Sequence, residues 1–423
     1  MRKLFFITFS ILLYFHSLSQ DITGTWKGNI EISGQQLPII FHFKKDSLGN
    51  IDGKWDSPLQ KAVNLPFSSI NTDRDSLRLS IKMIGGSYAG RFIDNDSIAG
   101  MWSQSGKQFN LNFARSSGEF SIEPKTSLRP GEKEIAITSY DGNKLYGNLL
   151  AKNDQQKLAI IIAGSGPTDR DGNNPLGNKA DSYKLLAYAL DSQNIATFRY
   201  DKRGIGESIP PDFNQANVVF DDYVKDAEMI FSYLHDSLGF KNIYFIGHSE
   251  GSLIGMIASQ KKAVKGYVSI AGPGRPIDAV IEEQENASSL HDSMKRKVTS
   301  IFNELKKGNT TDDVPAELNS LFNKSIQPYF ISWLKYDPAK EIKKLRCPVL
   351  ILQGSCDKQV KVKDAEILHK ASPKSKIGII PLMTHALKNA NADCVDENYK
   401  TYLDPSLPIN QKLVEDISDF IKK

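Results

Sequence analysis

Short apolar runs that alternate with helical segments dominate the chain from residue 158 onward. The runs at 158–163, 196–200 and 243–246 are typical of strands buried on both faces of a sheet. Between them, as in 221–238, apolar residues recur on one helix face. Such alternation predicts a mostly parallel sheet covered by helices on both sides. The other predicted elements are a hairpin at 134–140 and 144–151, strands at 266–270, 348–352 and 376–380, and helices at 182–193, from 252, at 363–370 and at 411–421.

A different pattern precedes this region. In 77–83 and 109–113, apolar and polar residues alternate, as in strands with one face in a core. Gly-x-Trp recurs at Trp26, Trp55 and Trp102. These tryptophans either form an exposed ligand platform or fill a small barrel or curled sheet, and the second interpretation is favoured because large aromatics mainly serve cores. The domains predicted from these patterns are an antiparallel all-β domain over 20–115, a proline-containing linker over 116–133 and an α/β domain over 134–423.

The strand–helix alternation stops between Pro276 and Arg346. The segment 277–345 instead reads as helices joined by short loops. Ligands bind at the carboxyl ends of strands in sheets of this kind, and the insertion lies just before a strand that leads to such an end. We therefore expect 277–345 to form a cap over the site, with a helical excursion far from the site as the alternative.

The first residues read as an export signal. Arg2 and Lys3 precede an apolar run over 4–15, and Ser17 and Ser19 are the small residues of a cleavage site. The run is shorter than the roughly 20 residues that span a bilayer, which disfavours a membrane anchor. No cysteine lies near the cleavage point, which disfavours a lipoprotein. We expect residues 1–19 to be removed and the mature protein to be secreted or periplasmic.

Composition excludes several classes of partner. The net charge is +4 over 423 residues, without a Lys/Arg cluster, so no nucleic-acid partner is expected. The three cysteines, Cys347, Cys356 and Cys394, permit one disulfide but define no disulfide framework and no zinc spacing. We expect no metal, no cofactor and no stable membrane insertion. The pairing of the cysteines and the oligomeric state stay open.

One pentapeptide carries a catalytic signature. Residues 247–251 read Gly-His-Ser-Glu-Gly, which matches G-x-S-x-G between a buried strand and a helix. The turn is so tight that small residues must flank the nucleophile, and Gly247 and Gly251 supply them. The pattern predicts Ser249 as an exposed nucleophile.

Three segments together carry a family resemblance. They are 164–172 (Gly-Ser-Gly-Pro-Thr-Asp-Arg-Asp-Gly), 201–208 (Asp-Lys-Arg-Gly-Ile-Gly-Glu-Ser) and 247–251. From about 132 to 423 the chain resembles bacterial carboxylesterases of the α/β-hydrolase superfamily and is similar to its serine aminopeptidase-like and dienelactone-hydrolase-like branches. The family usually has His before the first glycine of the oxyanion loop, where this chain has Ala163. The β domain resembles, in pattern only, the lipocalin-like domains that precede some bacterial hydrolases.

A serine nucleophile needs a base and an acid, which follow it in this fold in the order Ser, acid, His. Asp357 follows the strand at 348–352, and His385 follows the strand at 376–380. His248 adjoins the serine, but strand geometry directs it elsewhere. The less suitable candidates are His42, His235, His291, His369, Asp364, Asp393 and Asp396. The expected triad is Ser249, Asp357 and His385.

An oxyanion hole needs two backbone donors. The amide of Glu250, directly after the nucleophile, is one. The loop 163–167 supplies the other, for which Ser165 is chosen and Gly166 is the alternative. This loop lacks the lysine and the spacing of a phosphate-binding loop. Charged residues 169–171 either bind a substrate group or, as favoured, bridge to each other or to Arg203.

The expected reaction is hydrolysis of a carboxylic ester of a small molecule through an acyl-enzyme. A peptidase or amidase on the same triad is the alternative, and it would need acidic residues such as Glu282, Glu283 or Glu285 beside the site to hold a free amine. A thioesterase and a binding protein without catalysis are further alternatives. The natural substrate and its acyl-chain length stay open.

Overall fold

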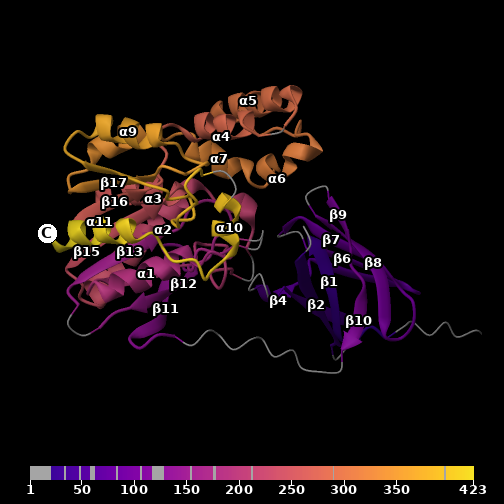
Figure 1. Ribbon diagram of the computed structural model, residues 1–423. Helices are drawn as coiled ribbons and strands as arrows, with labels where there is room; N and C mark the ends of the chain where they lie inside the picture. Colours follow the sequence, from indigo (N-terminus) through magenta and orange to yellow (C-terminus); the bar gives the residue numbers. More distant parts are fainter. Residues whose placement is uncertain are drawn as a thin grey trace, which may run out of the picture. The chain divides into compact units, whose positions relative to one another are not determined.

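The computed structural model describes most of the chain (Figure 1). The described residues are 21–423 apart from 33–34, 47–48, 58–61, 82–83, 105–106, 117–127, 153–154, 175–177, 211–212, 289 and 395–396. The predicted signal peptide and most of the predicted linker lie outside them. The chain divides into two compact units, Met1–Phe120 and Ser121–Lys423, and each is described by itself. No helix among the described residues combines the length and the apolar character needed to cross a bilayer.

The first unit is one curled antiparallel sheet of ten strands, in the order β4-β3-β2-β1-β10-β8-β7-β6-β5 with β9 paired to β8. Period-two patterning explains its two faces: in β6 the side chains of Leu77 and Leu79 are buried, while Arg78 between them is exposed. The strands are β1 (Gly24–Ile32), β2 (Gln35–Lys45), β3 (Ile51–Ser57), β4 (Ala62–Pro66), β5 (Ser69–Asp73), β6 (Ser76–Ile81), β7 (Gly86–Phe92), β8 (Ser97–Gln104), β9 (Lys107–Asn110) and β10 (Phe113–Ser116).

The predicted alternation at 109–113 spans two strands, β9 and β10, and the burial alternates as expected, with Leu111 and Phe113 buried and Asn110 and Asn112 exposed. Leu111 and Asn112, between the two strands, both form hydrogen bonds with Gly100 of β8. The Leu111 amide donates to the Gly100 carbonyl (2.9 Å), and the Gly100 amide donates to Asn112 Oδ1 (3.1 Å). Both strands pair with β8 in one continuous register, from Met101 opposite Asn110 to Ile98 opposite Phe113, so the break between them inserts no extra residue.

The three Gly-x-Trp tryptophans lie in the interior of this sheet. Trp26 is fully buried, and Trp55 and Trp102 are 2% and 3% exposed. Trp26 Nε1 donates to the Ile22 carbonyl (2.8 Å), and its ring meets the ring of Phe92 edge to face. These contacts agree with the interior interpretation and leave none of the three rings as a surface platform.

Trp26→Ala should therefore destabilise the first unit by about 3–5 kcal/mol, because it leaves a cavity in a packed core. Chemical denaturation followed by circular dichroism measures this. The matched control is Ile93→Ala in the same unit, since Ile93 is 66% exposed. A cost for Trp26→Ala no larger than that of the control would contradict the interior role.

The second unit contains an eight-stranded sheet in the order β11-β12-β14-β13-β15-β16-β17-β18. Strand β12 is antiparallel to both neighbours, and the pairs from β14 to β18 are parallel. The strands are β11 (Glu132–Thr138), β12 (Lys144–Leu150), β13 (Lys157–Ile162), β14 (Ala196–Tyr200), β15 (Asn242–His248), β16 (Gly266–Ile270), β17 (Val349–Gly354) and β18 (Lys376–Ile380). The predicted hairpin is present, with its first strand beginning two residues before 134.

Helices cover both faces of this sheet, and the two faces form separate hydrophobic clusters. Ile160 of β13 packs in the cluster that includes α2, α3 and α9, while Ile161 packs in the cluster that includes α1 and α11. These helices are α1 (Ser182–Ser192), α2 (Phe220–Ser232), α3 (Glu250–Lys261), α9 (Val362–Ala371) and α11 (Gln411–Lys422). Helix α10 (Glu397–Leu403) was not predicted, and the predicted helix 221–238 continues past α2 as a π-helical turn over Tyr233–Ser237.

Between β16 and β17 the chain forms the helices drawn in orange in Figure 1. They are α4 (Ile277–Asn286), α5 (Asp292–Lys306), α6 (Asn319–Phe322), α7 (Gln327–Trp333) and α8 (Pro338–Glu341), with short 3₁₀ turns at Ala316–Leu318 and Ile342–Lys344 and a further one before α2 at Gln215–Asn217. The insertion packs in the same hydrophobic cluster as α2. Trp333 of α7 stacks on Phe220 of α2, with ring centroids 5.4 Å apart.

Candidate active site

Ser249 occupies the turn between β15 and α3, at the carboxyl end of a central strand. Its φ of 54° and ψ of −121° are values that residues other than glycine rarely adopt. A Cβ on Gly247 would lie 2.2 Å from the Gly251 carbonyl oxygen. A Cβ on Gly251 would lie 2.3 Å from the carbonyl oxygen of Ile162, the last residue of β13. The turn is the strained strand–turn–helix elbow that a G-x-S-x-G nucleophile needs.

The elbow places Ser249 against the loop that follows β13. A Cβ built on Gly164 would lie 3.2 Å from the Cβ of Ser249, which is tighter than most side-chain contacts. Ser249 is partly exposed, whereas its neighbours His248 and Glu250 are buried. The serine is thus presented to solvent beside a loop whose backbone lies within contact distance.

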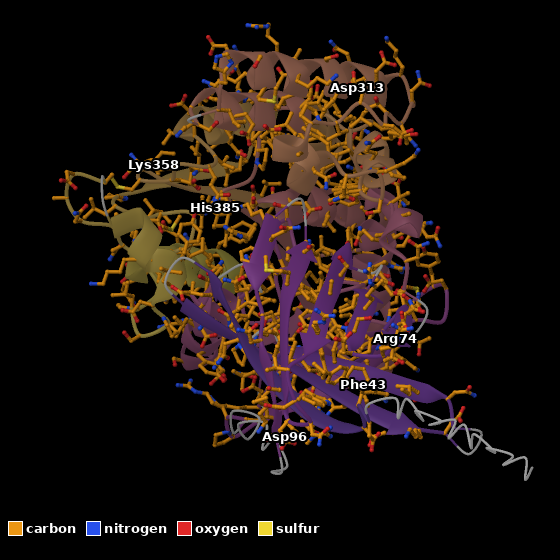
Figure 2. The ribbon with its side chains drawn as sticks, turned by 90° about the vertical axis from the view of Figure 1, so that its right-hand side faces the viewer. Phe43, Arg74, Asp96, Asp313, Lys358 and His385 are labelled. Carbon is orange, nitrogen blue, oxygen red and sulfur yellow. A yellow bond between two sulfur atoms is a disulfide. The ribbon has the colours of Figure 1, made fainter. Side chains whose placement is uncertain are left out.

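His385 and Asp357 form a hydrogen-bonded pair in the loops after β18 and β17. His385 Nδ1 lies 2.8 Å from Asp357 Oδ2. An ionised carboxylate only accepts, so Nδ1 donates, and Nε2 is left as the acceptor that a general base needs. The His385 side chain lies inside the unit, whereas Lys358, next to the carboxylate, is exposed (Figure 2).

Asp357 is held by four hydrogen bonds. Oδ2 also accepts from Gln353 Nε2 (3.0 Å), and Oδ1 accepts from the amides of Gln359 (2.8 Å) and Val360 (3.0 Å). Burial raises the pKa of Asp357, but the nearby His385 and the hydrogen bonds outweigh burial and hold this pKa below its usual value. The carboxylate therefore stays ionised beside His385.

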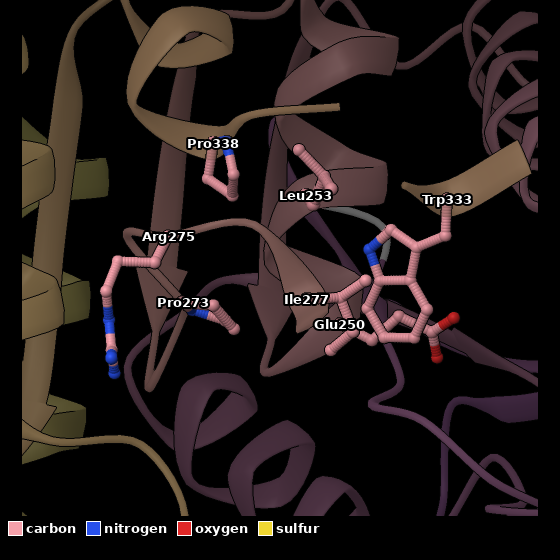
Figure 3. A pocket seen from close by; sticks show the side chains of 7 residues that line it. All are labelled: Glu250, Leu253, Pro273, Arg275, Ile277, Trp333 and Pro338. Atoms are coloured by element: carbon pink, nitrogen blue, oxygen red, sulfur yellow. The ribbon is translucent and has the colours of Figure 1, made fainter. Parts of the chain in front are cut away.

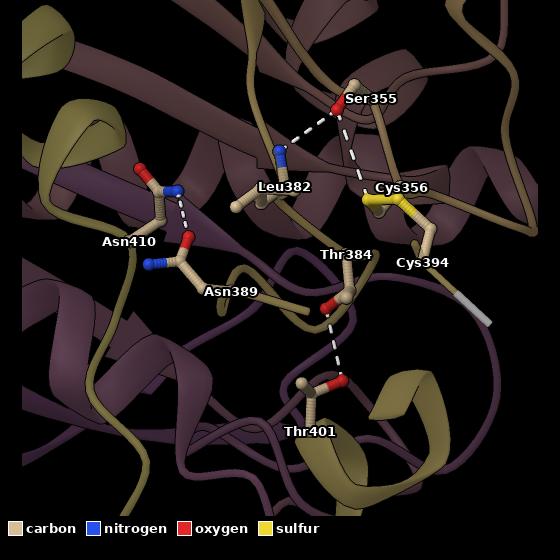
Figure 4. The surroundings of a disulfide bond; sticks show 8 residues. All are labelled: Ser355, Cys356, Leu382, Thr384, Asn389, Cys394, Thr401 and Asn410. Carbon is tan, nitrogen blue, oxygen red and sulfur yellow. Dashed lines mark hydrogen bonds between the residues drawn. A yellow bond between two sulfur atoms is a disulfide. The ribbon is translucent and has the colours of Figure 1, made fainter. Parts of the chain in front are cut away.

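The loops that carry the acid and the base are tied together (Figure 4). Cys356, the residue before the acid, forms a disulfide with Cys394. The Cys356 amide donates to the Met383 carbonyl (3.1 Å), and the Leu382 amide donates to Ser355 Oγ (2.9 Å). These bonds fix the two loops relative to each other.

The candidate oxyanion donors belong to the residue after the serine and to the loop after Gly164, which lies against the serine. Ser165 and Gly166 are exposed, and Gly166 has a φ of 75°. Within the described residues, no hydrogen bond runs from the backbone amide of Ser165, Gly166 or Glu250 to another protein group. All three amides are therefore available to a substrate oxygen.

Two comparisons of sequence point to the same class of protein. Residues 175–321 match the family described as serine aminopeptidase, S33. The esterase EstD of Thermotoga maritima is 30% identical over 224 residues, which are 52% of this chain and 52% of that protein. The chain thus spans about half the length of this curated relative. The chain has the α/β-hydrolase fold and resembles bacterial esterases.

Solved structures similar to this chain include two bacterial or archaeal esterases. Est1E from Butyrivibrio proteoclasticus, with ferulic acid bound, is 21% identical with a TM-score of 0.46, covering 68% of this chain and 98% of its own. The esterase Pf2001 of Pyrococcus furiosus is 18% identical with a TM-score of 0.44, covering 63% of this chain and 88% of its own.

The charged run 169–171, after the loop 163–167, is held in ion pairs. Arg170 is buried, with Nη2 2.6 Å from Asp201 Oδ2 and 2.5 Å from Glu207 Oε2. Asp171 Oδ1 lies 2.9 Å from Arg199 Nε. These pairs agree with the favoured structural interpretation of the run, because they join the loop after β13 to β14 and the loop that follows it.

Arg203 is not the partner of this run, so that part of the prediction is wrong. Its guanidinium points toward α2 instead, where Nη2 lies 2.7 Å from Asp226 Oδ1. Nη1 pairs with Asp141 in the turn between β11 and β12. The carboxylates of Asp226 and Asp141 thus bind the Arg203 guanidinium on the α2 side of the sheet.

Sequence reasoning missed a buried polar chain beside the serine. The His248 ring lies beside the ring of His385, with centroids 4.6 Å apart, and its Nε2 lies 3.0 Å from the His385 carbonyl oxygen. Its Nδ1 lies 2.8 Å from Tyr183 Oη. A second missed residue is Lys202, buried beside Glu250. In the sequence, His248 and Lys202 were marked only by lying inside recognisable motifs, and Tyr183 only by lying at the start of a predicted helix.

No group of three or more His, Cys, Asp or Glu side chains among the described residues is arranged to hold a metal ion.

The remaining described histidines have other roles. Nearby partners account for the others: His42 pairs with Asp56, His235 with Asp236, His291 caps α5 and His369 bonds Ser375.

His248 makes the stability of the second unit depend on pH. Burial, together with the neighbouring His385, lowers the pKa of His248 from 6.5 to about 3. The unfolded chain binds a proton there below about pH 6.5 and the folded chain does not, so stability falls as the pH decreases toward 3. His248→Gln should flatten the slope of unfolding free energy against pH by up to about 1.4 kcal/mol per unit.

Urea denaturation between pH 4 and pH 7 measures both slopes. Tyr244→Phe, which removes a buried hydroxyl that does not ionise between pH 4 and pH 7, is the matched control and should leave the slope of the parent protein in place. Equal slopes for His248→Gln and the parent would show that His248 titrates in the folded protein as it does in the unfolded chain.

Proposed function

We propose that this α/β-hydrolase cleaves carboxylic esters of small molecules through Ser249, His385 and Asp357. The observation that carries the proposal is the strained serine elbow at the sheet edge where the hydrogen-bonded pair of His385 and Asp357 also lies. The likeness to an esterase over about half of each chain supports the choice of an ester bond.

The proposed reaction is acyl transfer to water. Ser249 Oγ attacks the ester carbonyl carbon while His385 Nε2 takes the hydroxyl proton. The negatively charged oxygen of the tetrahedral intermediate accepts hydrogen bonds from two backbone amides, that of Glu250 and that of Ser165 or Gly166. The C–O bond to the leaving alcohol then breaks as His385 returns the proton to the alcohol oxygen. Water then attacks the acyl-serine by the same steps and releases the acid.

Hydrolysis of amides is the second candidate, and one observation disfavours its aminopeptidase form. Glu283 was a candidate for holding a free amine, but it is engaged by Arg275 Nη2 (2.6 Å) and Lys363 Nζ (2.7 Å). A substrate ammonium would have to displace both cations. The thioesterase and the binding protein remain less supported alternatives, since no contact in the described residues favours either.

The insertion between β16 and β17 is proposed as a cap that limits the acyl group. A small cavity is lined in part by Glu250, the residue after the serine, and its lining joins the elbow helix to the insertion (Figure 3). The lining residues are Glu250, Leu253, Pro273, Arg275, Ile277, Trp333 and Pro338. A wall of this kind would exclude water and select substrates by size.

Export is proposed from the signal-like first residues, and the disulfide between Cys356 and Cys394 supports it. Disulfides persist in oxidising compartments. Cys347 is the free thiol, and burial raises its pKa to about 11, which makes it a poor nucleophile. A secreted or periplasmic location, a small acyl substrate and no nucleic-acid partner remain parts of the proposal.

Loss of the nucleophile gives the direct test. Ser249→Ala should abolish labelling by a fluorophosphonate probe and nearly all turnover of p-nitrophenyl esters. Asp357→Asn should lower kcat on the order of 10⁴-fold, because it favours the wrong tautomer of the base. Parallel assays on aminoacyl p-nitroanilides decide between ester and amide.

Ser259→Ala, a buried serine near the end of α3 that bonds Gly255, is the control and should retain activity. The triad is wrong if Ser249→Ala retains the parent kcat, or if Asp357→Asn is silent while another aspartate proves essential. Faster cleavage of anilides than of esters would replace the esterase proposal by the peptidase alternative.

The cap proposal predicts a change of substrate size. Trp333→Leu should raise the ratio of kcat/KM for an octanoyl over a butanoyl ester by about tenfold, because opening a pocket wall admits longer chains. The control is Val298→Ala, which is buried in α5 and does not line the cavity. A variant that lacks residues 21–125 tests the first unit in the same assay. If that deletion alone changes the preference, the first unit forms the wall.

A further inference from the structure

The backbone of Gly164, beside the serine, is held at both of its polar atoms by buried side chains. Its carbonyl oxygen accepts from Lys202 Nζ at 2.6 Å. Its amide donates to Tyr183 Oη at 2.9 Å. The two side chains come from different elements, since Lys202 follows β14 and Tyr183 lies in the first turn of α1. Gly164 is thus clamped between them, one residue before the candidate oxyanion donor Ser165.

Each clamp continues to a residue that flanks the nucleophile. Lys202 Nζ also lies 2.9 Å from Glu250 Oε2, so the lysine joins Gly164 to the residue after Ser249. This same residue offers its backbone amide to the oxyanion. One ammonium group therefore joins the two segments that carry the two candidate donors.

The Tyr183 branch reaches the residue before the serine. His248 Nε2 faces the His385 carbonyl oxygen, which only accepts, so Nε2 carries the proton and Nδ1 accepts from Tyr183 Oη. Tyr183 Oη in turn accepts from the Gly164 amide. Every polar atom on this path has a donor facing an acceptor, and the path ends on the loop of the base.

Stability alone gives a poor account of this arrangement. Lys202 and Glu250 are each 2% exposed, and a buried ion pair commonly stabilises a fold no more than apolar side chains of similar size. What the pair supplies that apolar groups cannot is a directed hydrogen bond to one carbonyl. A Cβ built on Gly164 would lie 3.2 Å from the Cβ of Ser249, so the residue held through that carbonyl lies directly against the nucleophile.

We propose that Lys202 and Tyr183 are positioning residues that fix Gly164, so that the amide of Ser165 points at the oxygen of the transition state. The proposal rests on the proposed function. Oxyanion stabilisation depends on donors aimed before the reaction, and loss of one donor lowers kcat by about 10²–10³-fold. Loosening the support of a donor that remains should cost less than its removal.

The test compares three variants. Tyr183→Phe removes the hydroxyl and keeps the ring. Lys202→Met frees the Gly164 carbonyl but leaves Glu250 charged and buried. The double variant Lys202→Met/Glu250→Gln frees the same carbonyl without that unpaired charge, so it separates loss of positioning from the cost of a buried carboxylate.

Each variant should lower kcat for p-nitrophenyl butyrate by about 10–100-fold with KM within about twofold, because the oxyanion contact strengthens only in the transition state. Affinity for a trifluoromethyl ketone, which forms a tetrahedral adduct with the serine, should fall by the same factor. A merely structural role would change neither this split nor the analogue. The matched control is Tyr244→Phe, which removes a buried hydroxyl that bonds the Ile421 carbonyl at the other end of β15.

Failure of this proposal is distinguishable from failure of the proposed function. A parent protein that neither reacts with a fluorophosphonate nor cleaves any ester overturns the proposed function. If the parent reacts normally, kcat and analogue affinity within twofold of the parent in folded Tyr183→Phe and in the double variant overturn the positioning role. Should Lys202→Met fail to fold, those two variants decide alone.

Discussion

The approach of Gly251 to the end of β13 is the contact on which the rest of the site depends. No side chain fits between this residue and the carbonyl oxygens of Ile162 and Ala163, so the elbow sits directly on the neighbouring strand. In this arrangement the backbone of Ser249 is strained, and Ser249 lies against Gly164. Parallel strands end at one edge of the sheet, so the loops after β17 and β18 open on the same side. A backbone contact, rather than any single polar bond, thus determines which loops can meet.

Much of the α/β unit could be read from the sequence because its central strands are buried on both faces. The strands β14, β16 and β18 have the predicted bounds, since each is a short apolar run between clear turn signals. The elbow is equally local, because five consecutive residues determine it. The choice of Asp357 and His385 needed only the order of elements along the chain, and the structure brings these two side chains within hydrogen-bond distance.

The features that escaped prediction depend on partners far away in the sequence. The break between β9 and β10 accompanies the hydrogen bond from the Gly100 amide to the Asn112 side chain, which period-two patterning does not encode. The link from Cys356 to Cys394 spans 38 residues. The burial of Lys202 depends on a carbonyl and a carboxylate from two other segments. A lysine in a loop ordinarily indicates solvent, so the sequence alone favours the wrong environment for it.

Ser165 lies in an exposed loop and has only its backbone amide assigned to the chemistry. Its side chain is therefore decoupled from the feature that makes the position useful. Such a position suits directed evolution. A library at residue 165 varies the size and charge of a side chain near the site, while Gly164 keeps the peptide group in place. Most positions near a nucleophile lack this freedom, since there the side chain and the chemistry are the same atoms.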